Sequence, residues 1–194
     1  GLSEDFGDTV SGSTIGMEGI RAVWRARDRV LPPTLLTDKF VQRAGCSDVE
    51  EIFYKMYTGK IPFAALEPAA PLVFDAAREG DAAAADILEA SGNYLARMVL
   101  ACASKLEMCR EPFKVVMAGS VFKGSSPVLI DAMTTGIHRL APDARMVMPL
   151  FEPVVGALLL GIELDLEVTE TIYGTLSSEL EAAESRFGVR FKSE

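Results

Sequence analysis

Apolar residues recur at spacings of three and four over most of the chain, and this pattern predicts a helix-rich protein. The first such segment begins at Met17. Its apolar face is expected to consist of Ile20, Val23, Trp24 and Val30, with Arg27 at its edge. The sixteen residues before it are rich in Gly, Ser, Thr and Asp, and this composition predicts a loop that holds at most a short strand.

Proline, glycine and capping residues divide the next part of the chain into further helices. Pro32-Pro33 ends the first helix, and Thr34 can cap a second helix that closes at Gly45. Ser47 or Asp48 caps a third helix, and we leave the choice between the two open.

The middle of the chain predicts two more helices. One covers roughly residues 63–79, where Pro68 and Pro71 indicate either a kink or a start near Ala69. Gly80-Asp81 then stops this helix and caps the longest one in the chain. Its apolar stripe comprises Ala84, Ile87, Leu88, Ser91, Leu95, Met98, Cys102, Leu106 and Cys109. We expect this stripe to be the central packing surface.

Strand character appears only after Pro112, in two short segments. Residues 113–119 predict one strand, and residues 144–149 predict another after an intervening helix. A strand, a crossover helix and a second strand favour a parallel, right-handed unit. Helices over residues 153–164 and 167–187 follow.

A pair of strands makes a poor sheet alone, because an isolated pair is marginal in water. Either the N-terminal loop adds strands, or a partner completes the sheet. The predicted fold class is therefore α/β, helix-rich, with an incomplete sheet in this chain.

Composition narrows the class of protein. The chain has 194 residues and a formal net charge of −9, which argues against nucleic-acid binding because phosphates require a basic surface. Its longest apolar run, residues 154–162, is too short for a bilayer, and no signal peptide is visible. We therefore expect a cytoplasmic protein. The three cysteines lack metal-type spacing, and Cys102 and Cys109 are expected to be reduced core residues.

The first candidate for chemistry is VVMAGSVFKGS, residues 115–125. A parallel strand that ends in small residues places backbone at the edge where open α/β folds bind ligands. Gly119 would let a flat ring such as adenine approach the backbone, Ser120 could bind a ribose hydroxyl or phosphate, and Lys123 could reach a phosphate. A simple strand-to-helix turn is the alternative.

Three further motifs have weaker functional interpretations. In FGDTVSGSTIG, residues 6–16, Asp8 could accept from sugar hydroxyls or hold hydrated Mg²⁺, although a solvated loop is favoured. Residues 153–161, PVVGALLLG, favour a tightly packed helix over an anion site. His138 beside Arg139 is expected to be a helix-end cation rather than a catalytic base.

In their order along the chain, these pieces resemble the BadF/BadG/BcrA/BcrD-type ATPase and N-acetylglucosamine kinase family, which belongs to the actin-like sugar kinase superfamily. The matching stretches are GDTVSGSTIG, MEGIRAVWRARDRVLPPTLL, APLVFDAAREGDAAAADILEASGNYLA, VVMAGSVFKGS and MPLFEPVVGALLLG. Each motif alone is weak, but their sequential agreement is specific.

The resemblance implies that residues 1–194 form the C-terminal, nucleotide-binding lobe of a two-lobed enzyme with a ribonuclease-H-like core in each lobe. The chain begins Gly-Leu-Ser-Glu without an initiator methionine, and we expect the N-terminal lobe to be missing from it. The resemblance assigns ATP with Mg²⁺ as cofactors and a small sugar as substrate. It maps the adenosine loop onto Gly119, Ser120, Val121, Phe122 and Lys123, the adenine neighbour onto Glu67, and sugar contacts onto Asp8 and Ser11.

Two departures weaken this mapping, and the catalytic parts are absent. Thr9 and Val10 replace an acidic residue and a glycine of the family, and Glu67 would narrow the adenine pocket. The chain has no counterpart of the family's N-terminal phosphate loop or catalytic Asp, so alone it should not be a competent kinase.

The preferred hypothesis is the C-terminal lobe of an ATP-dependent kinase for N-acetylglucosamine or glucosamine. One alternative, which the same resemblance implies, is an ATPase activator of an acyl-CoA reductase or dehydratase. Such activators bind an iron–sulfur cluster through cysteines between two subunits, and the alternative is disfavoured because no cysteine stands in an obvious exposed Gly-Cys loop. The other is a degenerate, non-catalytic lobe. The C-terminal helix could serve a homodimer interface.

Overall fold

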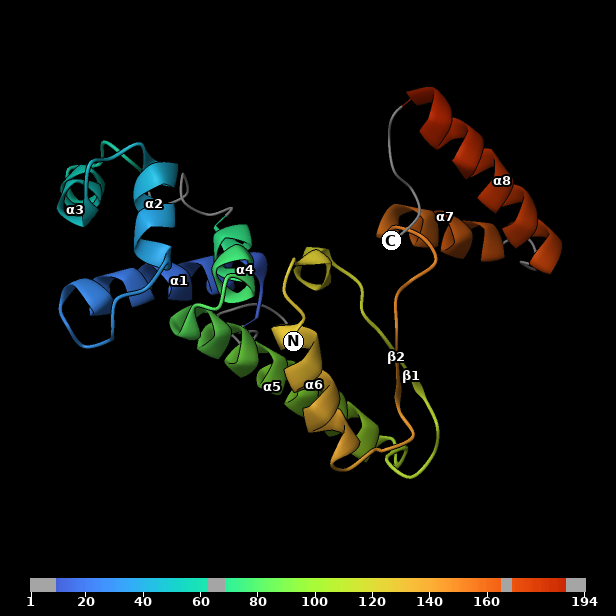
Figure 1. Ribbon diagram of the computed structural model, residues 1–194. Coiled ribbons are helices and arrows are strands. Elements are labelled where there is room, and N and C mark those ends of the chain that lie inside the picture. Colours follow the sequence, from blue (N-terminus) through green and yellow to red (C-terminus); the bar gives the residue numbers. More distant parts are fainter. Residues whose placement is uncertain (1–9, 63–68, 165–168, 188–194) are drawn as a thin grey trace. The chain divides into compact units, whose positions relative to one another are not determined.

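The computed structural model describes residues 10–62, 69–164 and 169–187, and these fall into two compact units (Figure 1). Unit 1 is drawn from Gly1–Phe113 and Gly119–Ala144, and unit 2 from Lys114–Ala118 and Arg145–Glu194. Each unit therefore combines segments that are separated in the sequence. The two are described one after the other.

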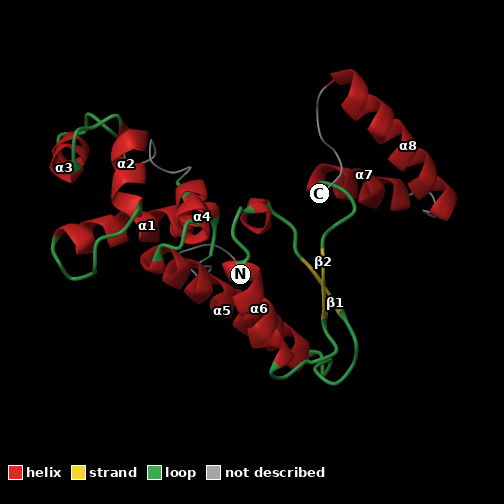
Figure 2. Cartoon of the chain, in the orientation of Figure 1, coloured by secondary structure: helices red, strands yellow, loops and turns green. Residues whose placement is uncertain are grey.

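The regular secondary structure in the described part of unit 1 consists of helices joined by loops (Figure 2). Its elements are α1 (Gly12–Arg27), α2 (Leu36–Ala44), α3 (Val49–Tyr57), α4 (Ala70–Arg78), α5 (Ala82–Lys105), the 3₁₀ helix η3 (Ser120–Lys123) and α6 (Val128–His138).

Helix α1 begins five residues earlier than the apolar pattern predicts, so the prediction of a loop up to Gly16 is wrong from Gly12 onward. Ser11 supplies the reason, because its hydroxyl accepts from the N–H of Thr14 while the hydroxyl of Thr14 accepts from the N–H of Ser11. This reciprocal capping box satisfies N–H groups that a helix start leaves unpaired. Polar capping residues can thus start a helix several residues before its first apolar position.

The predicted ends of the next helices are largely confirmed. Gly45 ends α2 in the left-handed conformation, at φ 61°, and Asp48 rather than Ser47 caps α3. Thr34 does not occupy the N-cap of α2, although its hydroxyl accepts from the N–H of Leu36. Helix α4 follows the later of the two predicted starts, with Ala69 at its N-cap.

The core of unit 1 gathers apolar side chains from α1, α2, α3, α4, α5 and α6. Its fully buried members include Ile15, Val23, Leu36, Phe40, Ile52, Val73, Leu88 and Leu129. The helices approach closely at α1, where a Cβ placed on Gly19 would lie 2.7 Å from Cγ2 of Val73. A residue without a side chain is needed at that crossing.

Helices α5 and α6 lie side by side (Figure 1) and meet through small residues. A Cβ on Gly92 would lie 2.3 Å from the carbonyl oxygen of Leu129, and one on Gly136 would lie 2.7 Å from Cβ of Ala96. The buried face of α5 therefore runs along Ala84, Leu88, Gly92, Ala96 and Ala103.

The predicted stripe of α5 is only partly confirmed by this arrangement. Ala84 and Leu88 are buried, but Leu106 is 67% exposed and lies beyond the end of the helix. Cys102 is exposed and Cys109 half-buried, so the prediction that both are core residues is wrong. The prediction was based mainly on the large apolar residues of α5. The buried face instead contains mainly small residues, because α6 lies too close to α5 for larger side chains.

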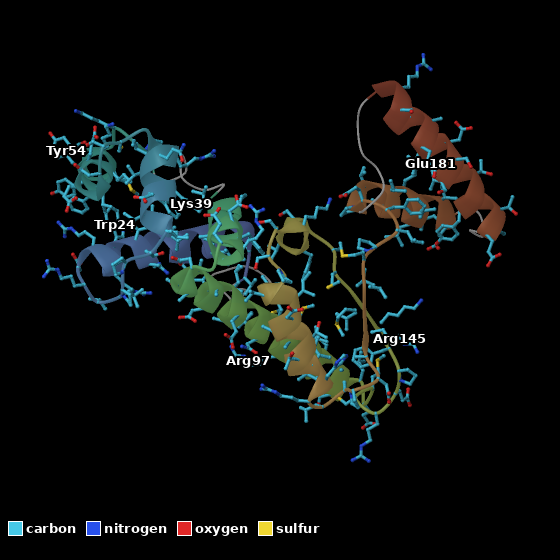
Figure 3. All side chains as sticks on the ribbon, in the orientation of Figure 1. Trp24, Lys39, Tyr54, Arg97, Arg145 and Glu181 are labelled. Atoms are coloured by element: carbon cyan, nitrogen blue, oxygen red, sulfur yellow. The ribbon has the colours of Figure 1, made fainter. Side chains whose placement is uncertain are left out.

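Buried Asp81 joins the start of α5 to the segment before α2. Its carboxylate accepts from the N–H of Ala84, from the hydroxyl of Thr34 and from the N–H of Leu35, at 2.8, 3.0 and 2.7 Å. Lys39, labelled in Figure 3, adds an ion pair of 2.9 Å from α2 to Glu79. The Gly-Asp pair thus acts as the predicted helix stop and cap, and it also anchors the Pro-Pro-Thr segment.

Unit 2 contains the predicted parallel strands. β1 (Lys114–Val116) pairs with β2 (Arg145–Val147), with Val115 opposite Met146, and the N–H of Met117 extends the ladder to Val147. Helices α7 (Pro153–Glu163) and α8 (Glu170–Phe187) follow. The parallel orientation and both helices match the sequence-based expectation.

Unit 2 leaves much apolar surface exposed within its described residues. On α7 the exposed side chains include Val154, Leu158 and Leu160, and Val116 of β1 is 56% exposed. The described residues are thus mostly helical, with a small two-stranded parallel sheet, as the helix-rich α/β prediction expects. Within the described ranges, no helix has both the length and the apolar character needed to cross a membrane.

Candidate functional site

A pocket of about 620 Å³ lies in unit 1, where three segments far apart in the sequence meet. The N-terminus of α1, the first two turns of α4 and the segment around η3 form its walls. The lining residues are Gly12, Ser13, Ala70, Pro71, Phe74, Asp75, Ser120, Val121, Lys123, Gly124 and Ser125. Apolar side chains come mainly from α4, and the polar groups come from all three segments.

Gly119 sets the path of the backbone into η3. Its φ of 118° and ψ of 163° fall in a region that is essentially restricted to glycine. The chain turns there directly after β1 and Met117-Ala118, and η3 starts at Ser120. Gly119 therefore fixes where Ser120 and Val121 stand, although it is not itself among the lining residues.

The segment after η3 packs closely on α4. A Cβ placed on Gly124 would lie 2.2 Å from Cδ1 of Phe74, so the backbone of Gly124 lies directly against the buried Phe74 ring. One residue later, the hydroxyl of Ser125 donates to the carboxylate of Asp75 at 2.9 Å. These two contacts hold the segment against the second turn of α4.

Helix α1 meets the same helix one turn earlier. A Cβ on Gly16 would lie 3.0 Å from Cβ of Ala69 and 3.1 Å from the nitrogen of Ala70. The N–H groups of Gly12 and Ser13 belong to the first turn of α1, where a helix provides no acceptor of its own. This turn, together with the Lys123 ammonium, is therefore a part of the pocket that suits an anion.

The pocket brings together three of the six predicted nucleotide residues. Ser120, Val121 and Lys123 line it, and Gly119 precedes them. Phe122 does not line the pocket, and both Val121 and Phe122 pack against the core. Glu67 lies outside the described residues.

The predicted sugar residues give a different result. Asp8 also lies outside the described residues, and Ser11 serves as the cap of α1. The sugar contacts of both residues stay predictions.

Sequence reasoning missed the contributions of α1 and α4 to the pocket. Phe74 and Asp75 appeared only as part of an apolar helix, because a helical pattern does not tell which face turns toward a distant loop. The signal that could have found them is the small-residue segment Gly124-Ser125, which requires a close neighbour. Gly12 and Ser13 were obscured by the prediction of a loop there.

The clear pKa shifts of the described residues lie away from this pocket, on α3 and the end of α1. The Lys55 ammonium, at 2.8 Å, and the Ser47 N–H and hydroxyl lower the pKa of Glu51 to about 2. The same bond to Glu51 raises the pKa of Lys55, and bonds to Glu50 and Asp28 raise the pKa of Arg27. These pairs are surface features of the α1–α3 region.

Metal-binding groups are sparse in the described ranges. No three His, Cys, Asp or Glu side chains there lie close enough together to hold a metal ion.

The family model described as the BadF/BadG/BcrA/BcrD ATPase family matches residues 1–161. The chain belongs to this family. The match includes unit 1 with its pocket, the two strands and most of α7. Membership in this ATPase family implies ATP as the nucleotide and an actin-like ATPase fold, as the motif order predicted.

An N-acetyl-D-glucosamine kinase from Dictyostelium discoideum is 29% identical to this family member over 162 residues. The aligned part is 81% of this chain and 50% of the kinase, so the chain spans about half the length of the curated relative that it matches. The similarity to this kinase is therefore distant and partial.

Proposed function

We propose that the chain is the C-terminal, nucleotide-binding lobe of an ATP-dependent sugar kinase that acts on N-acetylglucosamine or a related amino sugar. The pocket of α1, α4 and η3 is the observation that carries this proposal. It contains the predicted residues Ser120, Val121 and Lys123, in a chain that belongs to an ATPase family and is similar to an N-acetyl-D-glucosamine kinase. The lobe would have a ribonuclease-H-like core once its sheet is complete.

The chemistry of the pocket walls suits the parts of ATP. Pro71, Phe74 and Val121 offer apolar surface to a flat base, and the hydroxyl of Ser120 is available to a ribose hydroxyl. The N–H groups of Gly12 and Ser13 favour the phosphates, because the N-terminus of a helix carries partial positive charge. Mg²⁺ would neutralise phosphate charge during transfer.

The chemical step would require groups beyond these walls. Transfer of the γ-phosphoryl to a sugar hydroxyl needs a carboxylate that accepts the hydroxyl proton, and the resemblance places that carboxylate in an N-terminal lobe. In this proposal the described residues bind and orient ATP, and lobe closure excludes water from the transferred group.

Calorimetric titration of the full chain with ATP and Mg²⁺ tests the nucleotide site. We expect saturable binding that Gly119→Ala weakens at least about tenfold, because alanine cannot adopt the backbone conformation of Gly119 without strain of about 1–3 kcal/mol. Gly59→Ala is the matched control, since Gly59 also has a positive φ, 71°, with open space around its Cβ, and lies outside the pocket. No heat at millimolar ATP would sink the proposal.

An ATPase activator is the alternative within the same family, and one observation favours it. Cys46 follows Gly45 in the loop between α2 and α3, so the expectation that no cysteine stands in a Gly-Cys loop is incomplete. Cys46 is only half-buried, and its sulfur accepts from Lys55 at 3.5 Å. Two measurements distinguish the activator from the kinase. Iron–sulfur absorbance after anaerobic purification that is lost in Cys46→Ser would support the activator. Sugar-dependent ADP release by the full-length protein would support the kinase.

A further inference from the structure

Asp75 is the acidic residue that lines the pocket within its described walls. It stands on the second turn of α4, next to buried Phe74, and its side chain is 38% exposed. Oδ1 of Asp75 accepts from the hydroxyl of Ser125 at 2.9 Å and from the guanidinium of Arg78 at 3.1 Å. Two donors on different segments thus hold one oxygen of the carboxylate in place.

The second oxygen, Oδ2, has no hydrogen bond or ion pair to any side chain or backbone group that the structure describes. Since Oδ1 already accepts from two donors, Oδ2 is the oxygen of Asp75 that is left to accept from a ligand in the pocket that this residue lines. Such an oxygen attracts an N–H or O–H donor of a ligand and repels phosphate.

The pocket therefore has two chemically different ends along α4. Its first turn lies against α1 through Gly16, and α1 begins with the N–H groups that favour an anion. Its second turn lies against Gly124-Ser125 and carries Asp75. A nucleotide in this pocket would keep its phosphates near α1 and present the edge of its base to Asp75.

We propose that Asp75 is a specificity residue that accepts a hydrogen bond from the exocyclic amino group of adenine, with Ser125 and Arg78 as positioning residues. This inference rests on the proposed function, because it requires ATP in the pocket. Adenine offers its amino N–H as a donor at the base edge, and a carboxylate oxygen is the stronger kind of acceptor for it. The apolar walls on either side suit the flat ring rather than the ribose.

Binding of ATP is to be compared with binding of purine riboside triphosphate, which lacks only the amino group. We expect the full chain to bind ATP about tenfold more tightly, since a hydrogen bond to a charged group is worth roughly that factor in affinity. In Asp75→Asn, Oδ1 can keep the bond from Ser125, which leaves an NH₂ donor in place of Oδ2. That variant should bind the two nucleotides within about twofold of each other.

Matched measurements separate this effect from a loss of structure. Asp86→Asn removes a carboxylate from a different pocket, lined by α1 and α5, and should keep the wild-type ratio. Asp75→Ala should also lose the preference for ATP over purine riboside triphosphate. The ratio of the two affinities tests this even if both affinities fall. Substitution of Asp75 should change the binding of 2′-deoxy-ATP by the same factor as it changes the binding of ATP.

The outcomes are distinct. Equal binding of ATP and the analogue by the wild-type chain would overturn the role of Asp75 while leaving the ATP site intact. A preference for ATP over 2′-deoxy-ATP that Asp75→Asn abolishes would assign the carboxylate to the ribose and overturn the inference. Absence of ATP binding altogether would overturn the proposed function and this inference with it.

Discussion

Short polar side chains cap the N-termini of three helices in unit 1. Ser11, Asp48 and Asp81 each accept from a backbone N–H three residues later, at 3.1, 2.7 and 2.8 Å. Each bond satisfies a group that a helix start would otherwise leave unpaired. Buried Asp81 makes two further bonds, so its loss would affect two segments at once.

Glu51, in the first turn of α3, gives a residue-scale test through its pH dependence. Because folding lowers its pKa to about 2, the bonds to Lys55 and Ser47 stabilise the fold fully above the ordinary glutamate pKa of about 4.3. This contribution is lost as the pH falls from there toward 2. Glu51→Gln should therefore lower the urea midpoint at pH 7, and the difference from wild type should shrink by pH 3.

Unfolding in urea at pH 7, 5 and 3, followed by circular dichroism, measures this difference. A deficit of the same size at all three pH values would show that the substitution acts through something other than the lost charge. At alkaline pH the raised pKa of Lys55 keeps the pair charged, so no comparable loss is expected near pH 9.

At the scale of elements, most of the secondary structure follows from sequence. The capping and breaking signals at Gly45, Asp48 and Gly80-Asp81 work locally, and the structure confirms them. Local bonding also explains why the start of α1 was missed, because Ser11 and Thr14 extend the helix into a segment of loop-like composition.

Tertiary contacts are harder to predict than helix ends. The buried face of α5 passes through Gly92 and Ala96, which an apolar pattern does not mark, because α6 approaches there too closely for larger residues. The pocket shows the same limit. Ser120 and Lys123 were found from their position after a strand, whereas Phe74 and Asp75 join them through contacts across fifty residues.

Gly92→Ala tests the α5–α6 contact. The new Cβ would lie 2.3 Å from the backbone oxygen of Leu129, so the helices must move apart, and we expect a loss of about 1–3 kcal/mol in the free energy of unfolding. Denaturant titration measures this loss. Gly174→Ala on α8 is the control, because nothing lies within 4 Å of its Cβ and alanine favours a helix by about 0.5–1 kcal/mol. Equal stability of both variants would contradict the close contact.

At the scale of the whole molecule, Asp75, Phe74 and the η3 segment belong to one unit, while the sheet belongs to the other. The described walls of the pocket formed by α1, α4 and η3 thus depend on helix packing in unit 1. The two-stranded sheet of unit 2 and the exposed apolar side chains of α7 are where the proposed enzyme would add further structure.

The segments of the two units alternate along the sequence, and this determines what a single cut of the backbone would separate. A single cut between Ala144 and Arg145 would leave β1 on one fragment and β2 on the other. Within the described residues, the three-residue parallel ladder and the bond from Met117 to Val147 would then pair the two fragments. Because so short a ladder is marginal in water, we expect the nicked halves to separate in size-exclusion chromatography at micromolar concentration. Co-elution of the nicked halves would contradict this expectation and would show that the two fragments stay associated without the peptide bond.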